Sequence, residues 1–278
     1  MLRFTTFLSP LMYDTYEYIA HYVGQRIGIS TMFGVGQSTE KFSDGRADVG
    51  FMCGLLYARC ATQPYCPIEP ITAPVLSGER YQSQPVYFSD IVVRSDSPYT
   101  TFDDLEGCVW AYNERESHSG YNLVQAFLYQ RNKTLPYFGT MVKTGEHQAS
   151  LQAILDGNAD TTAIDSHVFD VWCLRNPDLA SQLRVIDTLG PSPIPPVVVS
   201  TSLDRDLKRN IQEAFLTMHH DPFAANRLRA SLLVKQFVAV GNEDYKVKWK
   251  ILEDEHSEKV WLFVRMDIVG EIQKQAHS

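Results

Sequence analysis

Cysteine is scarce in this chain of 278 residues, and its five cysteines are an odd number without C-x-x-C spacing. This pattern argues against a zinc site and against a full disulfide framework. Cys60 and Cys66 are close enough in sequence to close a small loop in an oxidising compartment, although two unpaired thiols is the favoured interpretation. We predict no metal site and no cofactor.

Long apolar runs and excess positive charge are also lacking. No run approaches the roughly 18 residues that a membrane-spanning helix needs, and the first ten residues do not resemble a secretion signal. We therefore expect either a cytoplasmic protein or one whose export signal is absent from this sequence. The net charge of -8 and the lack of a basic stripe argue against nucleic acids and anionic membranes as partners.

What the chain does have is a large apolar fraction arranged with alternating strand and helix periodicity. Its 278 residues suffice for two α/β domains or one large one, and its hydrophobic content of 44% argues for a well-filled core. The alternation favours parallel sheets. We predict one lobe from residues 1–90 and 188–278 and a second lobe from residues 91–187. Two chain crossings between the lobes would create a hinge and a cleft.

The most informative stretch is Asn113-Glu-Arg-Glu-Ser-His-Ser-Gly-Tyr121, which lies between a predicted strand at 108–112 and a predicted helix at 120–131. The hydroxyls of Ser117 and Ser119 and the first free N–H groups of the helix can converge on one oxyanion. Gly120 would let the backbone approach that ligand closely. The alternative is a plain serine N-cap.

Two further polar residues follow predicted strands. Asp165 comes at the carboxyl end of a strand, where open α/β sheets bind ligands; it is a candidate reader of an amine or hydroxyl group, or equally a helix cap. Ser9 follows the first strand in the same way, and its alternative role is an N-cap before Pro10. Gly34-Val-Gly-Gln-Ser-Thr39 lacks the lysine of a phosphate-binding loop, so nucleotide binding is rejected.

Several motifs, taken in order over residues 2–235, resemble the periplasmic phosphate/phosphonate-type substrate-binding proteins of ABC importers. The motifs are Phe7-Leu-Ser-Pro10, Gly45-Arg-Ala-Asp-Val-Gly-Phe51, Tyr87-Phe-Ser-Asp90, Asp96-Ser-Pro98, Phe102-Asp-Asp-Leu-Glu-Gly107, Ser117-His-Ser-Gly120, Gly145-Glu-His-Gln-Ala-Ser150 and Asp160-Thr-Thr-Ala-Ile-Asp165. The resemblance implies an α/β fold of type II, with two lobes, mixed sheets and a central ligand cleft.

The resemblance also implies which residues bind the ligand. In this family the Ser-x-Ser-Gly turn clasps the anion, which carries over to Ser117, His118, Ser119 and Gly120. The histidine of the G-x-H motif carries over to His147, for which we expect a protonated imidazole; a surface histidine at a helix start is the alternative. An aromatic residue that lines the pocket carries over to Tyr87.

Departures from the family pattern concern the organic part of the ligand. The aromatic residue that often follows the A-D-V strand is replaced by Met52 or Cys53, and the usual acidic residue is replaced by Asp165, slightly displaced, with His167 nearby. The anion-binding part of the pattern is retained, whereas the part that reads the organic tail is not.

The resemblance therefore predicts a solute-binding protein, not an enzyme, that captures a phosphonate, phosphate or phosphite for import. Its expected partners are the small oxyanion and a membrane permease, its expected location is the periplasm or cell envelope, and it is expected to be a monomer. An enzyme on the same fold is one alternative, but the motifs that predict the site contain no lysine. A cytoplasmic ligand-sensing regulator is the other.

Overall fold

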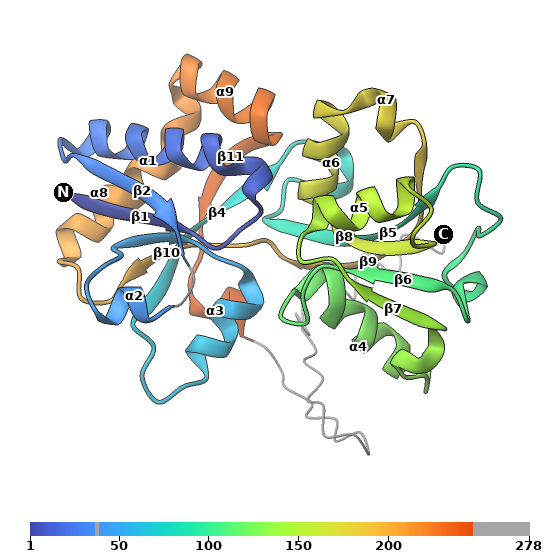
Figure 1. The fold of residues 1–278 in the computed structure, drawn as a ribbon. Helices are drawn as coiled ribbons and strands as arrows, with labels where there is room; N and C mark the ends of the chain where they lie inside the picture. The colour runs from blue at the N-terminus through green and yellow to red at the C-terminus, as the bar shows by residue number, and fades with distance from the viewer. Residues whose placement is uncertain (37–38, 247–278) are drawn as a thin grey trace. The chain divides into compact units, whose positions relative to one another are not determined.

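The computed structural model describes residues 1–36 and 39–246, and the chain in it divides into two compact units (Figure 1). The first unit contains Met1–Val86 and Pro193–Tyr245, and the second contains Tyr87–Ser192. The chain thus passes from one unit to the other twice. The predicted place of residues 247–278 in the first lobe lies outside the described residues.

The first unit is built on a mixed six-stranded sheet with the order β11-β4-β10-β3-β1-β2. β1 pairs in parallel with β2 and β3, whereas β10 lies antiparallel between β3 and β4. Helices α1, α8 and α9 cover one face, and α2 and α3 lie on the other (Figure 1). The strands are Leu2–Thr6 (β1), Thr31–Val35 (β2), Val49–Phe51 (β3), Ile68–Leu76 (β4), Val197–Ser200 (β10) and Val234–Ala239 (β11). The helices are Tyr13–Ile27 (α1), Glu40–Ser43 (α2), Gly54–Ala61 (α3), Arg205–Leu216 (α8) and Pro222–Leu232 (α9).

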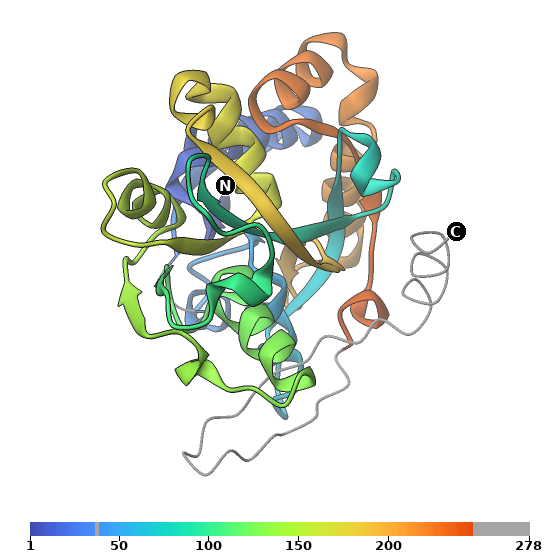
Figure 2. The same cartoon turned by 90° about the vertical axis from the view of Figure 1, so that its right-hand side faces the viewer.

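The second unit has a five-stranded sheet with the order β7-β6-β8-β5-β9. β6 is parallel to β7 and β8, and β5 is antiparallel to β8. Helix α4 lies on one face of this sheet and α5 and α6 on the other (Figure 2). The strands are Val86–Arg94 (β5), Val109–Tyr112 (β6), Thr140–Lys143 (β7), Thr161–Asp165 (β8) and Leu183–Pro193 (β9). The helices are Leu123–Gln130 (α4), His147–Leu155 (α5), Ser166–Arg175 (α6) and Pro177–Ala180 (α7).

Short helical turns complete the chain. A π-helical turn, η4, spans His118–Asn122 and leads directly into α4. The 3-10 turns are Pro10–Met12 (η1), Glu79–Tyr81 (η2), Phe102–Leu105 (η3), Leu135–Tyr137 (η5), Met218–His220 (η6) and Asn242–Tyr245 (η7). Within the described residues, no helix combines the length and the apolarity that crossing a bilayer requires.

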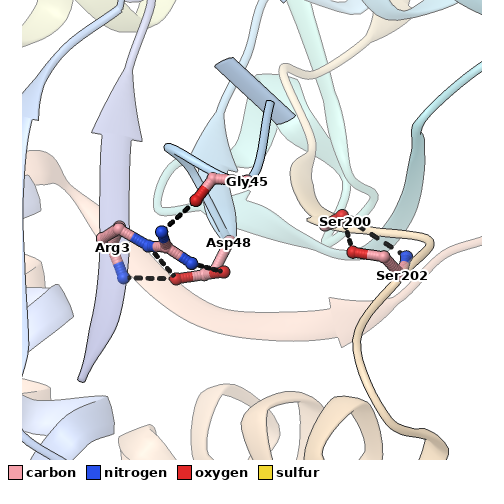
Figure 3. Close-up of polar contacts among 5 residues, drawn as sticks. All are labelled: Arg3, Gly45, Asp48, Ser200 and Ser202. Atoms are coloured by element: carbon pink, nitrogen blue, oxygen red, sulfur yellow. Dashed lines mark hydrogen bonds and ion pairs between the residues drawn. The ribbon is translucent and has the colours of Figure 1, made fainter. Parts of the chain in front are cut away.

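An ion pair between the half-exposed Arg3 and the buried Asp48 joins the amino ends of β1 and β3 (Figure 3). Asp48 is 6% exposed; its Oδ2 accepts from both the backbone N and the Nε of Arg3 at 2.8 Å, and its Oδ1 accepts from Nη2 at 2.8 Å. Arg3 Nη1 also donates to the carbonyl of Gly45. The aspartate of the Gly45–Phe51 motif therefore holds strands together.

Candidate functional site

Most of the predicted ligand residues gather at one edge of the second sheet. The parallel strands β6, β7 and β8 end at this edge, so the segments that follow them, residues 113–120, 144–147 and 165–167, come together there. The antiparallel strand β5 begins at the same edge, with Ser89 in register with Asp165. This is the sheet edge at which open α/β folds bind ligands.

The Ser-x-Ser-Gly segment forms the predicted helix start, but its first turn is π-helical. Ser117 is the N-cap, and its Oγ accepts a hydrogen bond from Gly120 N at 3.0 Å. The Ser89 hydroxyl donates to the carbonyl of Ser119 at 2.8 Å. Tyr121 follows Gly120 in this turn, and its buried ring stacks on Trp110 at a centroid distance of 5.6 Å.

Gly120 is required by a close approach to Asn113. A Cβ at position 120 would lie 2.0 Å from Asn113 Oδ1 and 3.0 Å from Ser117 Oγ. Such distances do not occur between unbonded atoms, so any side chain here would displace the Asn113 amide. The glycine therefore serves a contact within the protein, in addition to any approach of a ligand.

His118 and Tyr87 lie deeper than the resemblance suggests. Each is 2% exposed, and their ring centroids are 6.3 Å apart. His118 Nε2 lies 3.0 Å from Ser192 Oγ, which belongs to β9 of the same unit. These contacts give both side chains a role in packing, and their contact with a ligand stays a prediction.

His147 begins α5, and its burial favours the neutral imidazole. Its side chain is half-buried, and desolvation lowers its pKa to about 4. Its Nε2 lies 3.4 Å from Asn113 Nδ2, whereas its Nδ1 is buried without a hydrogen-bond partner among the described residues. Burial thus disfavours the protonated imidazole expected from the sequence, because desolvation opposes the charge.

Asp165 caps α6, and the pKa of its carboxyl group lies close to neutral pH. Its Oδ1 accepts from His167 N at 2.8 Å and from Val168 N at 3.2 Å. Desolvation raises its pKa to about 7, the two N–H donors oppose the shift, and the nearby Asp90 and Asp170 add to it. The helix cap is thus present, and it leaves the role of ligand reader open.

Ser9 lies in the first unit, where it caps the short turn η1. Its Oγ accepts from Leu11 N at 3.4 Å, and Pro10 occupies the first position of the turn, as the N-cap interpretation predicts. A ligand contact by Ser9 stays a prediction.

Two residues at the second unit's sheet edge were missed by sequence reasoning, namely Asn113 and Ser192. Asn113 directly follows the apolar strand β6, and that position was the available signal. Ser192 lies within the Pro-rich segment 190–196 and carries no comparable signal. Among residues 1–36 and 39–246, no group of three or more His, Cys, Asp or Glu side chains is arranged to hold a metal ion.

Comparison with known proteins gives one family. The family model described as the phosphonate periplasmic substrate-binding protein of an ABC transporter matches residues 7–245. A binding protein of an ABC phosphonate transporter from Pseudomonas aeruginosa is similar over 88% of this chain and 82% of its own, with 16% identity and a TM-score of 0.75. PhnD1 from Prochlorococcus marinus, solved with methylphosphonate, is similar over 88% of this chain and 94% of its own, with 14% identity and a TM-score of 0.75.

Proposed function

Because the chain belongs to the family of periplasmic substrate-binding proteins of phosphonate ABC transporters, we propose that it captures a small phosphorus oxyanion of the phosphonate, phosphate or phosphite class. The observation that carries this proposal is the set of polar side chains that meets where β6, β7 and β8 end. The family implies a small-molecule ligand and a membrane permease as partner. We propose that the protein delivers its cargo to that permease as a monomer.

The Ser117–Gly120 turn supports an anion because its donors are positioned before the ligand arrives. Ser117 Oγ accepts from Gly120 N, so its own proton remains able to point outward. The carbonyl of Ser119 is held by the Ser89 hydroxyl, which restrains the backbone that carries the Ser119 side chain. Donors fixed in advance cost little conformational entropy when the ligand binds.

His147 supports the same ligand as a neutral donor. Asn113 Nδ2 can only donate, so the His147 Nε2 beside it accepts, and the single imidazole proton then resides on Nδ1. A buried N–H without a partner is costly, and an oxyanion would satisfy it. Imidazole ¹⁵N chemical shifts test this assignment: an Nε2-protonated ring in the ligand-bound protein would contradict it.

The protonation state of Asp165 would decide which ligand groups it can contact. Its two backbone hydrogen bonds end on Oδ1, which leaves Oδ2 as the oxygen that can carry a proton toward a ligand. Protonated, it can donate to an anion; ionised, it repels a phosphorus oxyanion but can accept from an amine on an organic tail. We therefore propose that Asp165 helps to distinguish aminoalkyl phosphonates from simple ones.

The test is calorimetry of the purified protein with inorganic phosphate, phosphite, methylphosphonate, 2-aminoethylphosphonate and sulfate. Ser119→Ala should weaken binding of the preferred anion by about 1–3 kcal/mol, since a hydrogen-bond donor to a charged group is lost. Ser181→Ala is the matched control, because Ser181 is exposed and its Oγ donates to Asp178 O in the α7 turn. Equal affinities of the wild type and Ser119→Ala would reject the anion site, and no binding of any phosphorus anion would reject the ligand class.

A further inference from the structure

Cys60 and Cys66 lie side by side in the first unit. Cys60 is in the last turn of α3, Cys66 lies two residues before β4, and both side chains are half-buried. Their Sγ atoms are 2.7 Å apart. They pack against a hydrophobic cluster formed by Phe42, Ala47, Met52, Tyr57, Ile68, Val198 and Tyr245.

This separation is too short for two sulfur atoms that stay unbonded. Unbonded heavy atoms are most stable at about 3.5–4.0 Å, whereas the sulfurs of a disulfide are about 2.05 Å apart. A shift of less than about 1 Å would bring the two sulfurs to bonding distance. The segment between the cysteines includes Pro64, and Pro67 follows Cys66; each proline restricts the backbone around the pair.

We propose that Cys60 and Cys66 form an intramolecular disulfide that closes the connection between α3 and β4. The family to which the chain belongs works in the periplasm, where thiols of exported proteins are oxidised. The favoured interpretation of the sequence alone was two free thiols, because sequence spacing does not reveal how close the two side chains are.

The two thiols differ in a way that suits the reaction. The contact between them lowers the pKa of the Cys66 thiol and raises the pKa of the Cys60 thiol. The Cys66 thiolate attacks the disulfide of a thiol oxidant, forms a mixed disulfide and releases one oxidant thiolate. Cys60 then loses its proton and attacks Cys66 Sγ, which releases the second oxidant thiolate. The cysteine pair gives up two electrons and two protons, and the oxidant disulfide becomes two thiols.

The bond would anchor a helix that begins at the carboxyl edge of the first sheet. α3 starts at Gly54, directly after β3 and its following residues Met52 and Cys53. Its last turn would become covalently linked to the start of β4. This crosslink reduces the number of conformations open to the unfolded chain, and it restrains the end of α3 in the folded protein.

The experiment uses the full chain, treated with oxidised glutathione, denatured and alkylated with N-ethylmaleimide. We expect three labelled cysteines of the five, with Cys60 and Cys66 recovered in one crosslinked peptide, and five labelled after reduction. Labelling of both Cys60 and Cys66 in the oxidised sample would overturn the proposal. So would a crosslink of either cysteine to a different partner.

A stability measurement separates the specific bond from general effects of reductant. Dithiothreitol should lower the Tm of the oxidised wild type by several degrees, and the Tm of the control Cys173→Ser by the same amount. It should leave the Tm of Cys60→Ser/Cys66→Ser unchanged. An equal drop in the double variant would contradict the proposal, and the alkylation result on the wild type remains decisive if that variant fails to fold.

Discussion

At Gly120 a single methyl group would collide with the Asn113 amide, so we predict that Gly120→Ala is destabilising. The added Cβ would lie 2.0 Å from Asn113 Oδ1, which must move and carry the Asn113–His147 contact with it. Overpacking of this kind costs about 1–3 kcal/mol. Urea unfolding measures the loss, and calorimetry should show weaker anion binding in the same variant.

Gly34→Ala is the control for this substitution. Gly34 lies in β2, and a Cβ there would meet nothing within 4 Å. Its stability should stay within about 0.5 kcal/mol of the wild type. If Gly120→Ala proved as stable as Gly34→Ala, the close approach of Asn113 would be refuted.

At Asp165 we predict that the Asp165→Asn variant changes how stability depends on pH. The pKa of this group is raised from 3.8 to about 7, so its contribution to stability is complete below about pH 4 and is lost as the pH rises to about 7. The loss is at most about 4 kcal/mol. Asparagine keeps an oxygen to cap α6 but cannot ionise.

Urea unfolding of the wild type and Asp165→Asn at several pH values measures this effect. His147 acts oppositely, because its pKa is lowered from 6.5 to about 4 and its contribution is lost as the pH falls through that range. Both proteins contain His147, so its contribution cancels in the difference between their unfolding free energies. A difference that is flat from pH 4 to 7 would show that Asp165 is not desolvated.

At the scale of elements, we predict that removing the Arg3–Asp48 pair, which joins β1 and β3, lowers the free energy of unfolding. Asp48→Ala removes three hydrogen bonds that Arg3 donates to Asp48, one from its backbone N–H and two from its guanidinium. Because Asp48 is buried and the Arg3 side chain is 39% exposed, we expect a loss of about 2–3 kcal/mol in unfolding free energy, below that of a fully buried pair. Asp44→Ala breaks an exposed pair with Arg46 and should cost less than about 1 kcal/mol. Equal losses would contradict a structural role for Asp48.

The elements around the Ser-x-Ser-Gly turn show what a sequence can reveal. Apolar spacing identified the helix that carries Leu123, Val124, Phe127 and Leu128, because one helical face must be buried. It did not reveal that the first turn is π-helical, because the spacing of apolar residues over five positions does not distinguish a π-helical turn from an α-helical one. The contact between Asn113 and His147 was equally hidden, because 34 residues separate them.

At the scale of the whole molecule, alternating periodicity predicted α/β units with parallel sheets, whereas both sheets contain antiparallel pairs. The mixed sheets were implied only by the family resemblance. The type II binding-protein fold is confirmed by the solved relatives. The sequence did not show that β10 lies between β3 and β4, because an apolar run such as 196–199 suits any central strand. Because β10 takes this central position, the sheet of the first unit needs both residues 1–86 and residues 193–245.

This topology predicts which fragments fold. Residues 86–193 contain every strand of the second sheet, so we expect this fragment to unfold cooperatively in urea. Residues 1–86 lack β10 and β11, which leaves β4 without either of its sheet neighbours, so this fragment should show no cooperative transition.

The matched control joins residues 1–86 to 193–245 through a short glycine–serine linker. The two ends to be joined are adjacent, since Ile194 N donates to Pro85 O at 3.0 Å, so the linker should cause little strain. We expect circular dichroism to show cooperative unfolding for the joined fragment and for residues 86–193. Cooperative unfolding of residues 1–86 alone would mean that the strands β1 to β4 form a stable sheet without β10, and the predicted dependence would fail.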